Sequence, residues 1–302
     1  MTLKSLTKED FIFFDPKYNN ELVPDELYHY TSSDAIINII PKYTLRFTCI
    51  NCFDDKQEYR YVYKLILKNI LPKFKDRLIE NKLYKFIENR CNAIIQDKIF
   101  YENEAEIYSN YFVSCFSIDK NSKKMWKEYA KRENKIGYQF SVMTSDLYEC
   151  LSLDFRENFK DKYLFAKVCY DRKRQIEILE DIFDKYIYYY DENRDMYSDY
   201  RKLFDNIIMC CLFFKDKKYS FENEVRFVLI RDTQELKDKY PTQFINKNSI
   251  ISAYIEWNFN KKDYCLLKSI KISSSKNNFS AIYGIRQLAN YCNYIDINIV
   301  DI

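Results

Sequence analysis

The chain has very little glycine and almost no histidine. Its 302 residues include 2 glycines, Gly137 and Gly284, and 1 histidine, His29. The G-x-G-x-x-G dinucleotide turn, the G-x-x-x-x-G-K-[ST] phosphate loop and the G-x-S-x-G nucleophile elbow all need closely spaced glycines. None of these motifs can be written with this sequence, so a nucleotide would have to bind by another route.

The single histidine excludes every mechanism that needs two. Histidine-rich metal sites and the H-E-x-x-H motif are therefore excluded. A Cys–His or Ser–His nucleophile that uses His29 stays open, although no sequence feature selects the nucleophile. His29 lies in the stretch LYHYTSSDAIINII, residues 27–40, between two tyrosines and ahead of several hydroxyl side chains. The alternative interpretation is an ordinary polar residue on a buried strand.

Long apolar runs are also missing. The longest strongly apolar run covers residues 207–214, far short of the roughly 20 residues of a membrane-spanning helix. The N-terminal stretch MTLKSLTKEDFIFF carries acidic residues before any apolar run, unlike a signal peptide. We expect a cytoplasmic protein without a membrane partner, and therefore reduced cysteines that lie mostly in the core. Cys49 and Cys52 lack a second pair at zinc-site spacing, so no metal is expected.

The charge of the chain is nearly balanced. There are 48 Lys and Arg residues against 45 Asp and Glu residues, which gives a formal net charge of +3. This balance neither requires nor excludes nucleic acid. The densest basic stretch, residues 120–135, is typical of a solvated helix face, with phosphate contact as the alternative.

Alternating and helical patterns predict an α+β fold. Because no Gly/Ser linker and no repeat interrupts the pattern, we expect one domain over residues 1–302. Residues 1–26 would be a lead-in segment, and about 56–108 and 172–214 would be helical insertions. The expected strands are 27–30, 44–50, 111–118, 138–143, 164–170, 224–231, 253–257, 269–272 and 295–300. The expected shorter helices are 31–40, 122–132 and 280–291.

Two carboxylates stand out in the stretch YSFENEVRFVLI, residues 219–230. Glu222 and Glu224 are two positions apart at the start of an apolar strand, where an extended backbone would place them on the same side. Two such carboxylates repel each other unless a cation lies between them or one is protonated. One interpretation is a solvated strand end with one carboxylate paired to Arg226. The other is a pair that faces a cleft and stabilises a cationic transition state.

The stretch VSCFSIDKNSKKMWKEYA, residues 113–130, places hydroxyls and aromatics close together. Ser114 and Ser117 would lie at the end of a strand, and Trp126 and Tyr129 on a helix that folds back over it. Aromatics at this spacing are typical of a core. Stacking on a planar ligand ring is the alternative.

The order of several short motifs resembles a bacterial family known as domain-of-unknown-function 2971. The motifs are LYHYTS before a capped helix, TLRFTCINCFDDKQE, VSCFS followed by MWKEYA and IGYQFSV, FENEVRFVLI, and SIKISSS before a helix and a strand. The resemblance covers about residues 27–300. The family usually has Asn-Asp in the second motif, where this chain has Phe53-Asp54-Asp55.

That family is in turn distantly similar to the ADP-ribosyltransferase superfamily, whose members cleave the nicotinamide–ribose bond of NAD. The resemblance implies split antiparallel sheets with a large helical insertion, and NAD bound as a substrate in a cleft between the sheets. It also implies a toxin or defence effector, for which a neutralising partner protein would be expected. The acceptor of the ADP-ribose, whether protein, nucleic acid or water, is not implied.

The resemblance also assigns roles to residues. Glu224 would be the catalytic glutamate, and Glu222 the outer member of the pair. A carboxylate suits this chemistry because loss of nicotinamide leaves an oxocarbenium-like ribose that a nearby negative charge stabilises. His29 would donate to a ribose hydroxyl, and Arg46 or a lysine of the 120s would neutralise the pyrophosphate. The other implied NAD-binding residues are Tyr30, Thr31, Ser32, Ser114, Phe116, Ser117, Trp126 and Tyr129.

Two further hypotheses remain open. The fold could serve as a nucleotide-sensing or protein-interaction module without turnover, which would not need the pair of glutamates. A hydrolase that acts on nucleic acid would need acidic residues for a metal ion, and Asp54, Asp55 and Glu58 are the nearest set.

Overall fold

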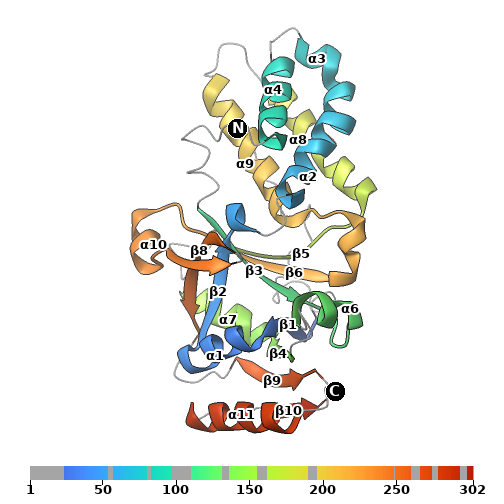
Figure 1. Cartoon of the computed structure of the whole chain (residues 1–302). Helices are drawn as coiled ribbons and strands as arrows, with labels where there is room; N and C mark the ends of the chain where they lie inside the picture. Colours follow the sequence, from blue (N-terminus) through green and yellow to red (C-terminus); the bar gives the residue numbers. More distant parts are fainter. Residues whose placement is uncertain are drawn as a thin grey trace. The chain divides into compact units, whose positions relative to one another are not determined.

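The structure, a computed structural model, contains both helices and a largely antiparallel sheet, which confirms the expected α+β class (Figure 1). The chain divides into two compact units, here called the helical unit and the sheet unit. The described part of the helical unit lies within residues 50–111 and 166–220, and that of the sheet unit within 24–49, 112–165 and 221–301. The structure describes residues 24–53, 57–79, 83–96, 110–130, 136–154, 162–189, 196–247, 249–259, 266–273, 278–292 and 298–301.

The helical unit is built from the two expected insertions. The apolar side chains of α2 and the turn after it recur every three or four residues, and Val62, Tyr63, Ile66 and Ile70 are fully buried. Cys210 and Cys211 are core residues, as predicted. Its elements are α2 (Gln57–Leu65), the π-helical η2 (Ile66–Ile70), η3 (Leu71–Phe74), α3 (Lys75–Ile79), α4 (Leu83–Ile95), α8 (Arg172–Tyr189) and α9 (Met196–Phe213).

The sheet unit contains a 10-stranded sheet. Along the main path the strand order is β10-β9-β4-β1-β3-β2-β8-β7, and β6 joins the sheet by pairing with β3 and β5. The pair β9–β10 is parallel, whereas β1, β2 and β4 form antiparallel pairs with their neighbours. The strands are β1 (Glu26–Ser32), β2 (Thr44–Cys49), β3 (Tyr111–Ser117), β4 (Gly137–Met143), β5 (Tyr163–Lys167), β6 (Glu224–Ile230), β7 (Gln243–Lys247), β8 (Ile250–Asn258), β9 (Leu267–Ile272) and β10 (Asn298–Asp301).

Strand β3 is the branch point of this sheet, because it has three neighbours, β1, β2 and β6. Strand β2 pairs with the beginning of β3, at Phe112 and Val113, whereas β1 pairs with its end, at Ser117. The helix α1 (Ser33–Lys42) connects β1 to β2. Strands β1 and β2 therefore pair with opposite ends of β3, and α1 connects them.

Several elements differ from the sequence prediction. Pro41 lies inside the last turn of α1, and the helix ends at Lys42, two residues later than expected, because Tyr43 adopts a left-handed conformation with φ 52°. The helix expected over 122–132 is a short α6 (Lys123–Met125), capped by Ser122, that continues as the π-helical η4 (Trp126–Ala130). Residues 131–135 lie outside the described part of the chain. The unexpected elements include α7 (Thr144–Asp154), α10 (Gln234–Lys239) and β7.

Candidate functional site

Strands β1 and β3 carry the expected site residues on two opposite faces. Tyr28 is the cross-strand partner of Ser117, so these two side chains share a face. The His29 ring packs on Phe116, with 5.5 Å between the ring centroids. Because successive strand residues alternate between faces, His29 and Phe116 lie on one face and Tyr30 and Ser117 on the other.

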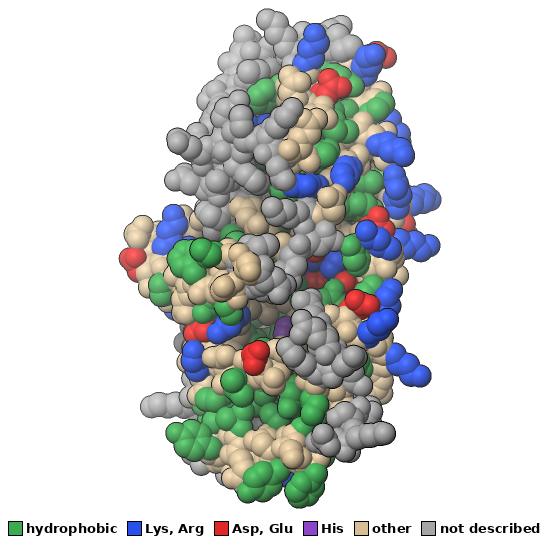
Figure 2. Space-filling model, in the orientation of Figure 1, with side chains coloured by type: hydrophobic (Ala, Val, Ile, Leu, Met, Phe, Trp, Pro, Cys, Tyr) green, Lys and Arg blue, Asp and Glu red, His purple; other side chains and the backbone are tan. Residues whose placement is uncertain are grey.

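The face of His29 contains a small cavity, here called the His29 pocket. Its volume is about 80 Å³. It lies where β1 and β2 meet β3 at opposite ends, with α1 beside it. The lining residues are His29, Ala35, Asn38, Ile39, Thr44, Leu45, Arg46 and Ser114. His29 is the purple side chain visible in a hollow of this face in Figure 2.

His29 is fixed by the backbone of β3. Its Nδ1 lies 2.7 Å from the carbonyl oxygen of Cys115, and because a carbonyl can only accept, Nδ1 carries the proton. Phe140 packs on the ring at a centroid distance of 5.0 Å. Burial lowers the pKa of His29, and the hydrogen bond to Cys115 offsets that effect only in part. The imidazole is therefore neutral at pH 7, with Nε2 as an acceptor.

Arg46 is the cation of the His29 pocket. Its Nε lies 3.5 Å from Oε1 of Glu256, and its guanidinium lies 4.7 Å from the ring centroid of Tyr254. The side chain is 29% exposed, so an anion could approach it. Thr31 is buried on β1, and Ser32 is the exposed N-cap residue of α1, whose side chain makes no capping hydrogen bond.

The opposite face holds an aromatic cluster with a buried carboxylate. Tyr30 packs edge-on against Trp126 at 5.2 Å, and Tyr129 packs against the buried cluster that contains these two residues. The Tyr129 hydroxyl donates to Oε1 of Glu222 at 2.5 Å, and the Ser117 hydroxyl donates to the backbone carbonyl of Glu222 at 2.7 Å. Glu222 is only 2% exposed. A carboxylate at such a depth needs donors, and Tyr129 supplies one.

The hydroxyl of Tyr30 is also committed. It donates to the carbonyl of Asp119 at 2.5 Å and accepts from the backbone N–H of Ser122 at 3.1 Å. Burial raises the pKa of Tyr30 to about 12, so the hydroxyl keeps its proton at neutral pH. These contacts fix the segment between β3 and α6, from which Lys120 and Asn121 also extend.

Glu224 forms a buried ion pair with Arg226. The two distances are 2.9 Å from Nε to Oε1 and 3.2 Å from Nη2 to Oε2, which is a bidentate arrangement. The residues are 5% and 1% exposed. Burial lowers the pKa of Arg226 to about 9. Pairing with Arg226 was one of the two interpretations of this stretch, but the pair is buried rather than solvated.

The expectation that Glu222 and Glu224 share one side of an extended strand is wrong. Glu222 ends the 3₁₀ helix η6 (Lys217–Glu222), and Asn223 follows with a left-handed φ of 42°. The strand begins only at Glu224. After this turn of the backbone, Glu222 accepts a hydrogen bond from Tyr129, and Glu224 pairs with Arg226.

The structure does not bring His29 and Glu224 into one cleft. Phe227 of β6 packs on Phe116 at 5.5 Å and stacks on Phe165 at 4.0 Å. Glu224 and its partner Arg226 alternate with Phe227 along β6 and therefore point to the face opposite His29. The expected residues His29, Arg46, Ser114 and Phe116 form one group, and Tyr30, Ser117, Trp126, Tyr129, Glu222 and Glu224 form the other.

The structure also gives the positions of further polar residues near the His29 pocket and in the helical unit. Asn38 and Thr44 also line the His29 pocket, although neither was among the expected site residues. Glu58, which was considered for a metal site, pairs with Lys215 at 3.6 Å in the helical unit, and Asp54 and Asp55 lie outside the described residues. Within the described ranges, no group of three or more His, Cys, Asp or Glu side chains is arranged to hold a metal ion.

No helix in the part of the chain that the structure describes has the length and apolar character to span a membrane. None of the nine cysteines there forms a disulfide.

Comparison with known proteins gives one match. Neither the curated proteins nor the solved structures contain a similar protein. A family model matches residues 125–227, a stretch that includes Trp126, Tyr129, Glu222, Glu224 and Arg226 but not the His29 pocket. Over that stretch, the chain is similar to the family described as "Protein of unknown function (DUF2971)".

Proposed function

We propose that the protein is an NAD-consuming enzyme of the ADP-ribosyltransferase type, which cleaves the nicotinamide–ribose bond. The observation that carries the proposal is the buried carboxylate of Glu222, held by the Tyr129 hydroxyl at 2.5 Å immediately before β6. Strand β3 pairs with both β1 and β6. The strand with His29 and the strand that begins at Glu224 thus both pair with β3, which supports the proposal.

The two glutamates make different contacts. Glu224 forms a bidentate ion pair with Arg226, whereas Glu222 accepts a hydrogen bond from the Tyr129 hydroxyl. A carboxylate that is already held in a bidentate ion pair stabilises a positive ribose less strongly. We therefore assign the stabilising role to Glu222, and a positioning role at the start of β6 to Glu224 with Arg226. This reverses the roles implied by the resemblance.

In the proposed reaction the bond between C1′ of the ribose and the pyridinium nitrogen breaks. The electron pair leaves with the nitrogen, so nicotinamide departs neutral and an oxocarbenium-like ribose remains. The Glu222 carboxylate stabilises this cation and accepts a hydrogen bond from the 2′-hydroxyl. An acceptor on a protein, a nucleic acid or water then attacks C1′ and gives its proton to the carboxylate. Tyr129 is the proposed aromatic beside the reacting groups, since Phe116 lies on the other face.

A second candidate function is a nucleotide sensor without turnover. The observation that favours it is the division of the site residues between two faces of β3. A nucleotide with a ribose hydroxyl that donates to Nε2 of His29 and a phosphate that faces Arg46 would lie on the opposite face from Glu222. Such a ligand would bind without being cleaved.

Release of nicotinamide from NAD by the purified protein distinguishes the two functions. For the enzyme we expect turnover that falls by at least about a hundredfold in Glu222→Gln, and by less in Glu224→Gln. For the sensor we expect thermal stabilisation by NAD and ADP-ribose without nicotinamide release, and loss of that stabilisation in His29→Ala. Full activity in Glu222→Gln would contradict the enzymatic proposal. Mg²⁺-dependent degradation of RNA or DNA would instead favour a hydrolase.

A further inference from the structure

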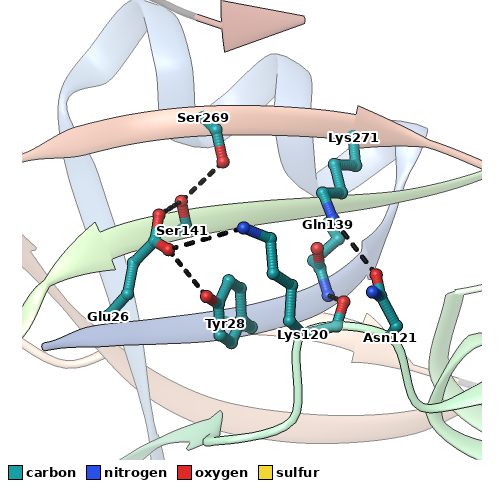
Figure 3. Close-up of polar contacts among 8 residues, drawn as sticks. All are labelled: Glu26, Tyr28, Lys120, Asn121, Gln139, Ser141, Ser269 and Lys271. Atoms are coloured by element: carbon teal, nitrogen blue, oxygen red, sulfur yellow. Dashed lines mark hydrogen bonds and ion pairs between the residues drawn. The ribbon is translucent and has the colours of Figure 1, made fainter. Parts of the chain in front are cut away.

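A second polar cluster lies on the face of the sheet that carries Tyr30 (Figure 3). The register between β1, β4 and β9 brings its residues together. Tyr28 is opposite Ser141, which is opposite Ser269. In the next row, Gln139 is opposite Lys271. Antiparallel partners share a face, so three strands bring polar side chains together. The lysine cluster, as we call it, consists of Glu26, Tyr28, Lys120, Asn121, Gln139, Ser141, Ser269 and Lys271.

The carboxylate of this cluster is held by neutral hydroxyls. The Tyr28 hydroxyl donates to Oε2 of Glu26 at 2.6 Å, and the Ser141 hydroxyl donates to Oε1 at 2.7 Å. Burial alone raises the pKa of Glu26, but these two hydrogen bonds and the nearby lysine charges bring it below its ordinary value. Glu26 is therefore a charged carboxylate at neutral pH, and it contributes one negative charge.

Two lysines oppose that single charge. Lys271 is only 7% exposed, and its Nζ donates to the amide oxygen of Asn121 at 3.1 Å. Lys120 Nζ lies 4.0 Å from Oε2 of Glu26, at the outer limit of an ion pair. Burial, followed by the positive charge of Lys120, lowers the pKa of Lys271, and Glu26 opposes this only in part. With both amines protonated, Lys120, Lys271 and Glu26 together carry a net charge of +1.

The cluster is open to solvent on one side. Lys120 and Asn121 are exposed, and Ser269 is half-buried. The Gln139 amide donates to the backbone carbonyl of Lys120 at 2.8 Å, which fixes the backbone at the base of that side chain. An incoming anion would meet two ammonium groups with hydroxyl and amide donors around them. Lysine ammonium groups with such neutral donors suit the several oxygens of a phosphate.

We propose that Lys120 and Lys271 form a phosphate-binding site on the face of the sheet that also carries Tyr30. The bound group is a phosphate or pyrophosphate. Its assignment to the pyrophosphate of NAD rests on the proposed function, whereas free inorganic phosphate would be the other source. Ser269 and Asn121 are the neutral donors of the site. Nothing in the sequence pairs position 120 with position 271, because the strand β9 comes 150 residues after the segment that holds Asn121.

Calorimetric titration with inorganic pyrophosphate and with ADP-ribose tests the proposal. We expect both probes to bind the full chain. Their affinity should fall at least about tenfold in Lys120→Gln and in Lys271→Gln. The loss of affinity caused by each substitution should be smaller at high salt. Lys127→Gln is the matched control, because Lys127 is an exposed lysine of η4 outside the cluster. The affinity of this variant for the two probes should differ from that of the wild type by less than about twofold. Lys120 is exposed, so Lys120→Gln remains a valid test even if Lys271→Gln does not fold.

The outcomes separate this site from the proposed activity. Pyrophosphate binding that is lost in Lys120→Gln, without any nicotinamide release from NAD, would support the site and overturn the enzymatic function. NAD turnover with an unchanged KM in Lys120→Gln would support the function and overturn the site. Failure of pyrophosphate to bind, or equal weakening in Lys127→Gln, would also overturn the site, whereas failure of ADP-ribose alone would overturn its assignment to the pyrophosphate of NAD.

Discussion

The hydroxyl of Tyr129 lies 2.5 Å from Oε1 of Glu222, although 93 residues separate the two in the chain. This contact joins the π-helical turn after α6 to the end of η6. It gives a buried carboxylate a hydroxyl donor. The role proposed for Glu222 depends on this contact.

Removing the hydroxyl should therefore destabilise the protein. Tyr129→Phe leaves a buried acceptor, the Glu222 carboxyl group, without this donor, and we expect a loss of about 1–3 kcal/mol in the free energy of unfolding. Nicotinamide release, if present, should fall as well. Urea denaturation measures the first effect. Tyr283→Phe, at a tyrosine that is 57% exposed on α11 (Asn278–Tyr291), is the control and should change neither quantity. An unchanged midpoint in Tyr129→Phe would mean that the contact is energetically unimportant.

The buried pair of Glu224 and Arg226 predicts a strong asymmetry between single and double variants. Arg226→Met leaves the Glu224 charge buried without its partner and should cost about 3–5 kcal/mol. The double variant Glu224→Gln/Arg226→Met should be more stable than the single variant. Arg77→Met is the control, because Arg77 pairs with Asp184 at 2.6 Å while both side chains are about half exposed, and such pairs contribute roughly 0–1 kcal/mol. A double variant less stable than Arg226→Met would contradict the argument.

His29 should make the stability of the protein dependent on pH. Burial lowers its pKa in the folded state below the ordinary value of 6.5, so the unfolded chain takes up a proton first as the pH falls. Folding stability is then lost as the pH decreases from 6.5 towards the lower folded-state pKa. Urea denaturation of the wild type and of His29→Gln at several pH values from about 7.5 downwards measures this loss. A wild type whose pH dependence equals that of His29→Gln would show that the imidazole does not stay neutral.

The two glycines should respond in opposite ways to alanine. A Cβ on Gly137 would lie 2.6 Å from the backbone carbon and the Cβ of Ala130, so β4 or η4 has to move. We expect Gly137→Ala to cost about 1–3 kcal/mol. Gly284 has no atom within 4 Å of such a Cβ and lies inside α11, so Gly284→Ala should stabilise by up to about 1 kcal/mol. Thermal unfolding of both variants checks the sign, and a stabilised Gly137→Ala would contradict the close packing of these elements.

Local patterns predicted most of the elements. The alternation in TLRFTC and the apolar spacing around Tyr59 and Tyr63 depend on neighbours within a few residues, and both elements formed where expected. The errors are also local. The π-helical continuation after Met125 and the left-handed Asn223 break the regular periods on which such predictions rest. The second error changed the site, because Glu222 was placed on a strand to which it does not belong.

The sequence by itself determined that this is an α+β protein, that glycine-based nucleotide motifs are absent, and that Arg226 is within reach of Glu224, two positions away on the same strand. Only the tertiary structure decided that Tyr129 reaches Glu222, that His29 is held by Cys115 86 positions away, and that the two groups face opposite sides of β3. It also decided that Lys120 and Lys271 come together. The physical reason is that strand order and register select these contacts, and they arise from the packing of the whole core rather than from any local period.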